Sequence, residues 1–128
     1  MRIEHIALWT RDLEKSKRFY CEYFGGEAGG MYRNEETGFR SYFIRFESGA
    51  RLEIMTEPAV EERRNRDEGF FGYSHLAFAV GSEAGVDELT ARLVAGGYPA
   101  ISGPRRTGDG YYESCVPDPD GNRVEITV

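Results

Sequence analysis

The fold is decided by a short stretch near the N-terminus, IEHIALW (residues 3–9), which returns later in the chain as YSHLAFA (residues 73–79). A second matching pair, GARLEIM (49–55) and GNRVEIT (121–127), follows the first at nearly the same spacing. Two copies are too few for a solenoid, which needs about three or more stacked repeats. We therefore expect a molecule with pseudo-twofold symmetry, built from one duplicated unit.

Each copy contains the same succession of predicted elements. Alternating apolar and polar residues predict strands, whereas Asp12 and Ser82 are candidate N-caps of helices that end at paired glycines. The expected elements are strands at 2–9, 41–47, 51–57, 73–80, 111–116 and 122–128, weaker strands at 27–33 and 99–103, and helices from Asp12 to about Phe24 and from Ser82 to Gly96. The apolar face of the second helix is expected to hold Val86, Leu89, Leu93 and Val94.

This order of elements predicts an α+β fold of two pseudo-symmetric βαβββ modules, residues 1–57 and 73–128. Residues 58–72 join the modules, with the charged run EERRNRDEG at their centre. We interpret this segment as a solvated linker, which also permits the two modules to pair across a dimer.

The composition excludes several classes of protein. Among 128 residues, 22 are acidic and 16 are Lys or Arg, and the net charge of -6 argues against binding a phosphate backbone. No apolar run approaches the roughly 20 residues that cross a bilayer, and the charged N-terminal stretch lacks the apolar centre of a signal peptide. Cys21 and Cys115 form no metal-binding spacing, so we expect reduced thiols in a cytoplasmic protein.

The only two histidines, His5 and His75, occupy matching positions, and so do Glu53 and Glu125 in the later strands. Successive side chains of a strand point to opposite faces. In each strand the neighbouring large apolar residues have one parity and the His or Glu has the other, so the polar side chain is expected to face away from the helix. The apolar residues concerned are Ile6 and Leu8, Leu52 and Ile54, Leu76, Phe78 and Val80, and Val124, Ile126 and Val128. A single histidine or glutamate in a strand is more often a structural residue, but the agreement of four strands favours a metal site.

The chemistry of these side chains limits which metal they would bind. Neutral imidazole and carboxylate groups suit a divalent nickel, cobalt, zinc, manganese or iron ion. Four protein ligands would leave positions open on an octahedral ion for water or substrate, as catalysis requires.

Four motifs together resemble the vicinal oxygen chelate superfamily, also called the glyoxalase/bleomycin resistance/dioxygenase family: HIALWTRDLEKSKRFYCEYFG (5–25), GARLEIM (49–55), HLAFAV (75–80) and DPDGNRVEI (118–126). The resemblance covers nearly the whole chain and implies βαβββ modules around a metal-binding concavity, often in a homodimer. It implies a set of metal ligands similar to that of bacterial lactoylglutathione lyases, which are typically activated by nickel or cobalt: His5, Glu53, His75 and Glu125. It also implies that Glu125 is the catalytic base that removes a proton from carbon, giving an enediolate, and that Glu53 returns the proton.

Two positions depart from the lactoylglutathione lyase pattern. Trp9 stands where an Arg usually grips the glutathione carboxylate, and Glu57 stands where an Asn is usual. A Trp forms no charge-assisted bond to a carboxylate, and a Glu repels one, so the thiol cosubstrate is left open. We interpret Trp9, on the strand face of His5, either as the floor of an apolar substrate pocket or as packing.

A second candidate substrate region is the segment RRTGDGYY (105–112). Its glycines predict a flexible loop, in which Arg105 and Tyr111 either close over an anionic substrate or remain solvated.

Together these features predict a metal-dependent lyase or isomerase that resembles lactoylglutathione lyase and acts on a small substrate with vicinal oxygens. One alternative is a bleomycin-resistance-like binding protein that sequesters a cationic ligand. The other is a different oxygen-chelate enzyme, an epimerase or a dioxygenase.

Overall fold

The computed structural model describes residues 3–61 and 72–128, and the chain divides into two compact units, residues 1–66 and 67–128. The elements of the first unit are β1 (His5–Trp9), α1 (Leu13–Phe24), β2 (Glu27–Ala28), β3 (Tyr32–Arg33), β4 (Arg40–Arg45) and β5 (Arg51–Thr56). Those of the second unit are β6 (His75–Ala79), α2 (Glu83–Ala95), β7 (Ser102–Arg106), β8 (Tyr112–Pro117) and β9 (Arg123–Thr127). Each unit therefore follows the predicted βαβββ order, with the second strand of the first unit split into β2 and β3.

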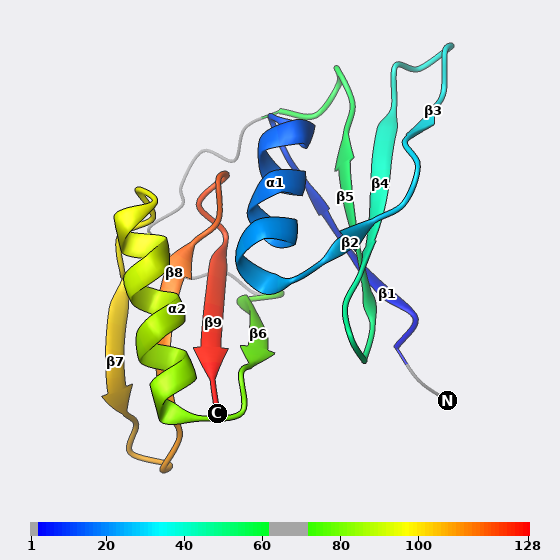
Figure 1. Cartoon of the computed structure of the whole chain (residues 1–128). Helices are drawn as coiled ribbons and strands as arrows, with labels where there is room; N and C mark the ends of the chain where they lie inside the picture. The colour runs from blue at the N-terminus through cyan, green and yellow to red at the C-terminus, as the bar shows by residue number, and fades with distance from the viewer. Residues whose placement is uncertain (1–2, 62–71) are drawn as a thin grey trace. The chain divides into compact units, whose positions relative to one another are not determined.

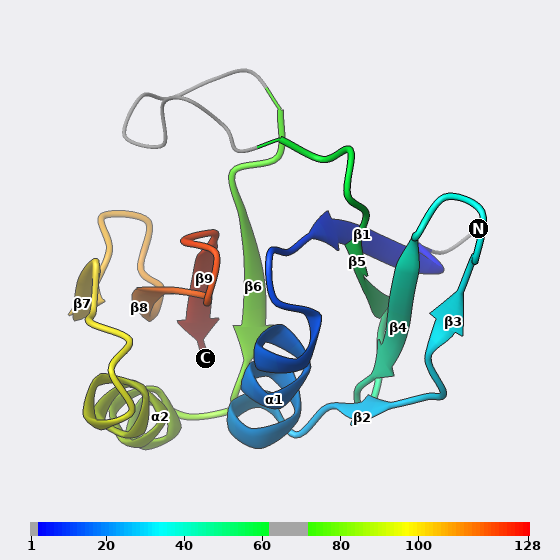
Figure 2. The same cartoon turned by 90° about the horizontal axis from the view of Figure 1, so that it is seen from above.

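The two sheets have the same topology. In the first, the strand order is β1-β5-β4-β2, and β3 also pairs with β4; in the second, the order is β6-β9-β8-β7. The first and last strands of each unit are parallel and the remaining pairs are antiparallel. Figures 1 and 2 show α1 on one face of the first sheet and α2 on one face of the second, so that each sheet has one face without a helix of its own unit.

Local sequence explains where α1 begins and ends. The Asp12 side chain accepts a hydrogen bond from the Lys15 backbone N–H, which satisfies a helix N–H that lacks an intrahelical partner. At the other end, Gly25 adopts φ 66°, the left-handed conformation that closes a helix at little cost only for glycine. Phe19 and Tyr20, 1% and 0% exposed, anchor the helix in the core of its unit.

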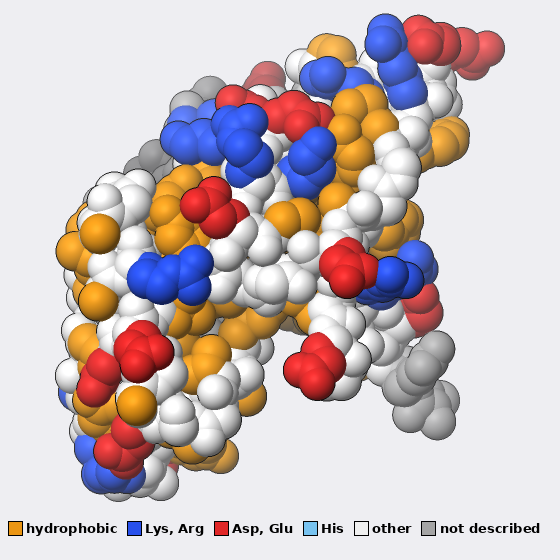
Figure 3. All heavy atoms as spheres, in the orientation of Figure 1, with side chains coloured by type: hydrophobic (Ala, Val, Ile, Leu, Met, Phe, Trp, Pro, Cys, Tyr) orange, Lys and Arg blue, Asp and Glu red, His pale blue; other side chains and the backbone are white. Residues whose placement is uncertain are grey.

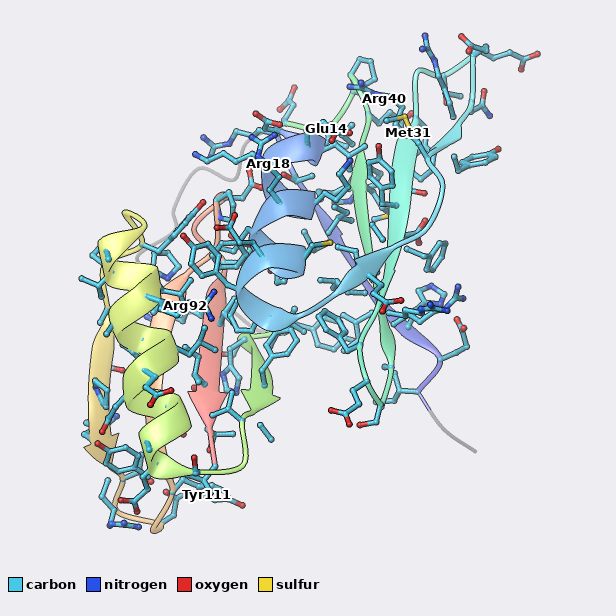
Figure 4. All side chains as sticks on the ribbon, in the orientation of Figure 1. Glu14, Arg18, Met31, Arg40, Arg92 and Tyr111 are labelled. Carbon is cyan, nitrogen blue, oxygen red and sulfur yellow. The ribbon has the colours of Figure 1, made fainter. Side chains whose placement is uncertain are left out.

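The outer side of α1 carries charges of both signs. Figure 3 shows Lys, Arg, Asp and Glu side chains gathered over the beginning of this helix, and Figure 4 labels Glu14 and Arg18 there. Glu14 accepts a hydrogen bond of 2.7 Å from the Tyr42 hydroxyl of β4 and forms an ion pair of 2.5 Å with Lys17. This group of polar side chains ties the helix to the sheet at the rim of the core.

In the second unit, α2 is fixed to its sheet by apolar packing and by one buried polar contact. Val86, Leu89 and Leu93 face the sheet, and Thr90 lies among them, 3% exposed. The Thr90 hydroxyl donates to the carbonyl of Val86 at 2.6 Å and lies 2.6 Å from the hydroxyl of Ser114 in β8. Because the Thr90 proton goes to Val86, the Ser114 hydroxyl donates to Thr90, so both buried groups are satisfied.

Two expectations about the second unit are wrong. Val94 is 48% exposed, because Val86, Leu89, Thr90 and Leu93 already form the buried stripe and Val94 falls at its margin. The strand expected at 99–103 runs instead from Ser102 to Arg106, so the first residues of the predicted loop are strand. The sequence Gly103-Pro104 is typical of the end of a strand. Here the strand continues across it, because the pairing with β8 shifts in register between Ser102 and Arg105.

The central part of the predicted linker, residues 62–71, lies outside the described residues, so the boundaries 1–57, 58–72 and 73–128 remain a prediction. Among the described residues, neither helix is long and apolar enough to cross a membrane.

Candidate metal centre

The first His/Glu pair results from the parallel pairing of β1 with β5. The register places His5 beside Arg51 and Ala7 beside Glu53. The histidine and the glutamate therefore lie on the same face of neighbouring strands, offset along the strands by two residues. His5 Nε2 lies 3.9 Å from Glu53 Oε2. Leu52 and Ile54, which alternate with Glu53, are 3% and 0% exposed, so the pair occupies the face opposite α1.

The second pair repeats this construction in β6 and β9. His75 lies beside Arg123 and Ala77 beside Glu125, and His75 Nε2 is 3.1 Å from Glu125 Oε2. The aliphatic neighbours of Glu125 in β9 are fully buried on the helix side. In each unit the sheet register thus brings together the two residues expected from the sequence.

The surroundings of the two histidines differ, although the two residues occupy matching positions in the sequence. His5 Nδ1 lies 2.6 Å from the carboxylate of Glu4, whose other oxygen accepts from Arg51 Nε at 2.9 Å. The His5 ring also packs edge-on against the Phe43 ring, at 5.3 Å between centroids. The Arg51 guanidinium lies over the face of the Phe43 ring, 4.2 Å from its centroid. The hydrogen bond from His5, followed by the contribution of Arg51, lowers the pKa of Glu4 despite some desolvation.

Phe43 and Cys115 occupy corresponding places beside the two glutamates. Phe43 pairs with Glu53 across β4 and β5, and Cys115 pairs with Glu125 across β8 and β9. Burial raises the pKa of the Cys115 thiol, and the nearby Glu125 charge raises it further. Both effects disfavour the thiolate form of Cys115, which is the reactive form of a cysteine.

The pair of donor groups in each unit, one imidazole and one carboxylate, fits a divalent cation. The Glu4 carboxylate can only accept a hydrogen bond at Nδ1 of His5, an arrangement that leaves Nε2 as the free lone pair on the side of Glu53. Imidazole nitrogen together with carboxylate oxygen suits a borderline divalent ion. Within residues 3–61 and 72–128, no group of three or more His, Cys, Asp or Glu side chains is placed to hold a metal ion. Each unit contributes one pair of donors, and the assignment of all four residues to one ion remains a prediction.

Trp9 belongs to the same face as the first pair. It ends β1 opposite Met55, and the register continues the row through Ser41 to Tyr32. Its indole packs edge-on against Phe39 at 6.1 Å between centroids and is 43% exposed. We call this the aromatic row, because Trp9 and Tyr32 stand at its two ends. Met31 lies near the same end of β4 (Figure 4), and the row is about 7 Å along the strands from the row that contains Glu53.

The other candidate substrate residues lie in the second unit or at the end of the first. Arg105 pairs with Glu113, and Glu113 with Thr127, so the register assigns Arg105 to the face of Glu125. Tyr111 is 57% exposed at the turn between β7 and β8 (Figure 4). Glu57 follows β5 at the end of its strand. Arg105 therefore lies on the same sheet face as Glu125, whereas Tyr111 lies at a turn.

A shallow groove in the second unit is separate from these residues. It has a volume of about 450 Å³ and lies between α2 and β7, where it is lined mainly by small and apolar side chains that include Val94, Ala95 and Pro104. Since α2 covers the face opposite Glu125, this groove does not belong to the candidate metal centre.

Two βαβββ modules, each a mixed sheet with one helix, define a class of α+β proteins. The chain belongs to the Glyoxalase/Bleomycin resistance protein/Dioxygenase superfamily, whose family model matches residues 2–126. This finding confirms the resemblance and the fold class predicted from the sequence.

Relatives and solved structures agree with this assignment over nearly the full chain. The uncharacterized protein YqjT of Bacillus subtilis (strain 168) is 31% identical over 138 aligned positions, covering 98% of both chains. A glyoxalase family protein from Enterococcus faecalis is 25% identical with a TM-score of 0.81, covering 99% of this chain and 97% of its own. Lactoylglutathione lyase from Agrobacterium tumefaciens is 26% identical with a TM-score of 0.69, covering 98% and 91%.

Proposed function

We propose that this protein is a metal-dependent lyase or isomerase of the lactoylglutathione lyase type, acting on a small substrate with vicinal oxygens. The observation that carries the proposal is the repetition of one His/Glu pair, by the same parallel register, on the same face of two sheets. A lone pair of this kind is commonplace in proteins, whereas its repetition in both units indicates a shared chemical task. The 26% identity to the lactoylglutathione lyase of Agrobacterium tumefaciens supports the same class.

The residues that would hold the cation are the two pairs, His5 with Glu53 and His75 with Glu125, contributed by one chain or by two chains of a homodimer. When bound, a nickel or cobalt ion, or else zinc, manganese or iron, polarises two neighbouring oxygens of the substrate and so acidifies the intervening C–H bond.

The two glutamates take the roles of proton acceptor and proton donor. Glu125, whose side chain is 23% exposed, would remove the proton from carbon. Glu53, 15% exposed, would return a proton to the adjacent carbon. For the adduct of a thiol and a 2-oxoaldehyde, this transfer gives the thioester of a 2-hydroxy acid.

The aromatic row supports an apolar thiol partner in place of glutathione. Trp9 is packed against Phe39 on the face of His5 and leaves about half of its surface accessible, so it offers an apolar surface one row from Glu53. Such a surface favours flat or aliphatic groups and gives a carboxylate no charge-assisted bond. Arg105, on the face of Glu125, is the candidate for an anionic group of the substrate.

One experiment tests the proposal on the purified full-length protein. We expect a bound divalent metal after purification without chelators, and turnover of methylglyoxal with at least one of glutathione, a bacterial low-molecular-mass thiol and an apolar thiol. Glu125→Gln should reduce kcat by about 100-fold or more, as loss of a general base does, while most of the metal stays bound.

Matched variants make the result specific. Glu88→Gln removes a carboxylate from the exposed side of α2 and should leave kcat unchanged. His5→Ala and His75→Ala should each lower the metal content. A protein that binds no metal but captures a cationic ligand would contradict the proposal and favour sequestration; consumption of oxygen with a catechol would contradict it in favour of a dioxygenase.

A further inference from the structure

The two histidines meet a neighbouring carboxylate with different ring nitrogens. His5 meets a carboxylate with Nδ1, at 2.6 Å from Glu4, while its Nε2 is 3.9 Å from Glu53, beyond hydrogen-bonding distance. His75 meets a carboxylate with Nε2, at 3.1 Å from Glu125. A carboxylate accepts a hydrogen bond but does not donate one. In the metal-free protein we therefore expect the proton of His5 on Nδ1, beside Glu4, and the proton of His75 on Nε2, beside Glu125.

The Glu4 carboxylate is itself held in place. Arg51 donates from Nε at 2.9 Å and contacts the same oxygen with a terminal nitrogen at 2.5 Å. The Arg51 backbone N–H also donates to the Glu4 carbonyl at 3.0 Å, so both the main chain and the side chain of Glu4 are tied to β5. Phe43 supports both Arg51, stacked on its face, and His5, packed against it edge-on.

We propose that Glu4 is a positioning residue for His5, held by Arg51, which keeps the imidazole proton on Nδ1 and leaves the Nε2 lone pair available to a divalent cation. A neutral imidazole in water favours the opposite tautomer, with the proton on Nε2, so an unsupported histidine must shift a proton before it can donate from that atom. The cation belongs to the proposed function, and this inference rests on it in that respect only.

The second unit lacks this support. Ser74 stands at the position that corresponds to Glu4, and Arg123, which pairs with His75 as Arg51 pairs with His5, has no glutamate there to hold. The two halves therefore contribute unequally. His5 is arranged for the cation in advance, whereas His75 must give up its Nε2 proton, or its contact with Glu125, before it can bind.

The test reads the tautomers directly in the metal-free, full-length protein. With only two histidines in the chain, long-range ¹H–¹⁵N correlation spectra at about pH 8.5, where a free imidazole is neutral, separate protonated from unprotonated ring nitrogens. The variant His75→Ala assigns the signals. We expect the proton on Nδ1 of His5 and on Nε2 of His75.

Two variants of the same residue sharpen the test. Glu4→Ala should move the His5 proton to Nε2. Glu4→Gln, which keeps the size of the side chain, should do the same, because Arg51 takes the amide oxygen and turns the amide N–H groups towards Nδ1. Ser74→Ala is the matched control and should leave both rings unchanged. A His5 proton that stays on Nδ1 in Glu4→Ala, or is found on Nε2 in the unaltered protein, would overturn the proposal.

Metal affinity provides the second readout. In competition with a chromogenic chelator for Ni²⁺, Glu4→Ala should weaken binding by about 10-fold, as loss of a residue that orients a ligand does, and Ser74→Ala by less than about twofold. Unchanged affinity in Glu4→Ala would overturn the link between the tautomer and the metal. These outcomes are distinct from failure of the proposed function, since the tautomers are measured without metal, substrate or turnover.

Discussion

Glu53 and Glu125 show how matched positions acquire different chemical surroundings. Both follow from the same register, yet Glu53 lies beside the ring of Phe43 and Glu125 beside the buried thiol of Cys115. Their histidines also stand at different distances, 3.9 and 3.1 Å. Under the proposed function, such differences would let two chemically identical side chains take separate roles in the proton transfer.

Glu14 permits a prediction about stability and pH. The ion pair with Lys17, and then the hydrogen bond from Tyr42, lower the pKa of Glu14 below its ordinary value of 4.5. A carboxyl group with a lowered folded-state pKa stabilises the protein above its unfolded value, and this contribution is lost as the pH falls through the folded value.

We therefore expect Glu14→Gln to lower the free energy of unfolding by less than about 1 kcal/mol at pH 7, because the group is largely exposed. The difference should shrink as the pH falls below about 4.5, in urea denaturation measured at several pH values. A difference that stays constant down to pH 3 would contradict the role assigned to the charge. Glu88→Gln, on the exposed side of α2, serves as the control.

At the scale of single residues, sequence reasoning found the pairs but missed their support. The parity of apolar residues in each strand was enough to place the four polar side chains on the face away from the helix. Glu4 precedes His5 directly in the chain, and this adjacency was the available signal. What could not be read was its partner Arg51, which β5 supplies from 47 positions away.

Among the elements, α2 and β8 are joined through the buried hydroxyls of Thr90 and Ser114. Two polar groups of 3% and 1% exposure are tolerated in an apolar layer because both are hydrogen-bonded, Ser114 to Thr90 and Thr90 to the Val86 carbonyl. The contact fixes the position of the helix along the strand, where apolar packing alone would tolerate sliding.

Replacing one partner should cost more than replacing both. Thr90→Val keeps the shape but leaves the Ser114 hydroxyl buried without its acceptor, so we expect a loss of about 1 to 3 kcal/mol in the free energy of unfolding. Thr90→Val combined with Ser114→Ala should recover part of this loss. Thermal and urea denaturation measure both variants, and a double variant less stable than the sum of the single ones would contradict the pairing.

The elements were predicted well where the local signals agree. Asp12, Ser82 and the glycines that follow the helices marked the boundaries, because capping depends on a few neighbouring residues. The position of β7 was missed, since Gly103-Pro104 resembles a terminator and only the pairing with β8 carries the strand through it. The exposure of Val94 depends on packing against the sheet, which periodicity alone does not determine.

Over the whole molecule, duplication supplies two half-sites, each with one imidazole and one carboxylate. A cation that takes ligands from both would stabilise the folded protein in proportion to its occupancy. At a free metal concentration of about 100 times the dissociation constant, the gain is about 2.7 kcal/mol.

Removal of the metal should therefore lower the thermal stability by a few degrees. We expect EDTA to reduce the Tm of the unaltered protein and Ni²⁺ to restore it, in differential scanning fluorimetry. The double variant His5→Ala/His75→Ala should show neither effect. An equal shift in the double variant would indicate that the metal acts elsewhere on the chain.

The outer position of β1 and β6 has one more consequence. In the described residues each of these strands has a hydrogen-bonded neighbour on one side alone, and a free edge can recruit further strands into fibrils. Both are only five residues long and begin with a histidine. Very short edge strands discourage such growth. The brevity of β1 and β6 therefore limits the length of edge to which another chain could add a strand.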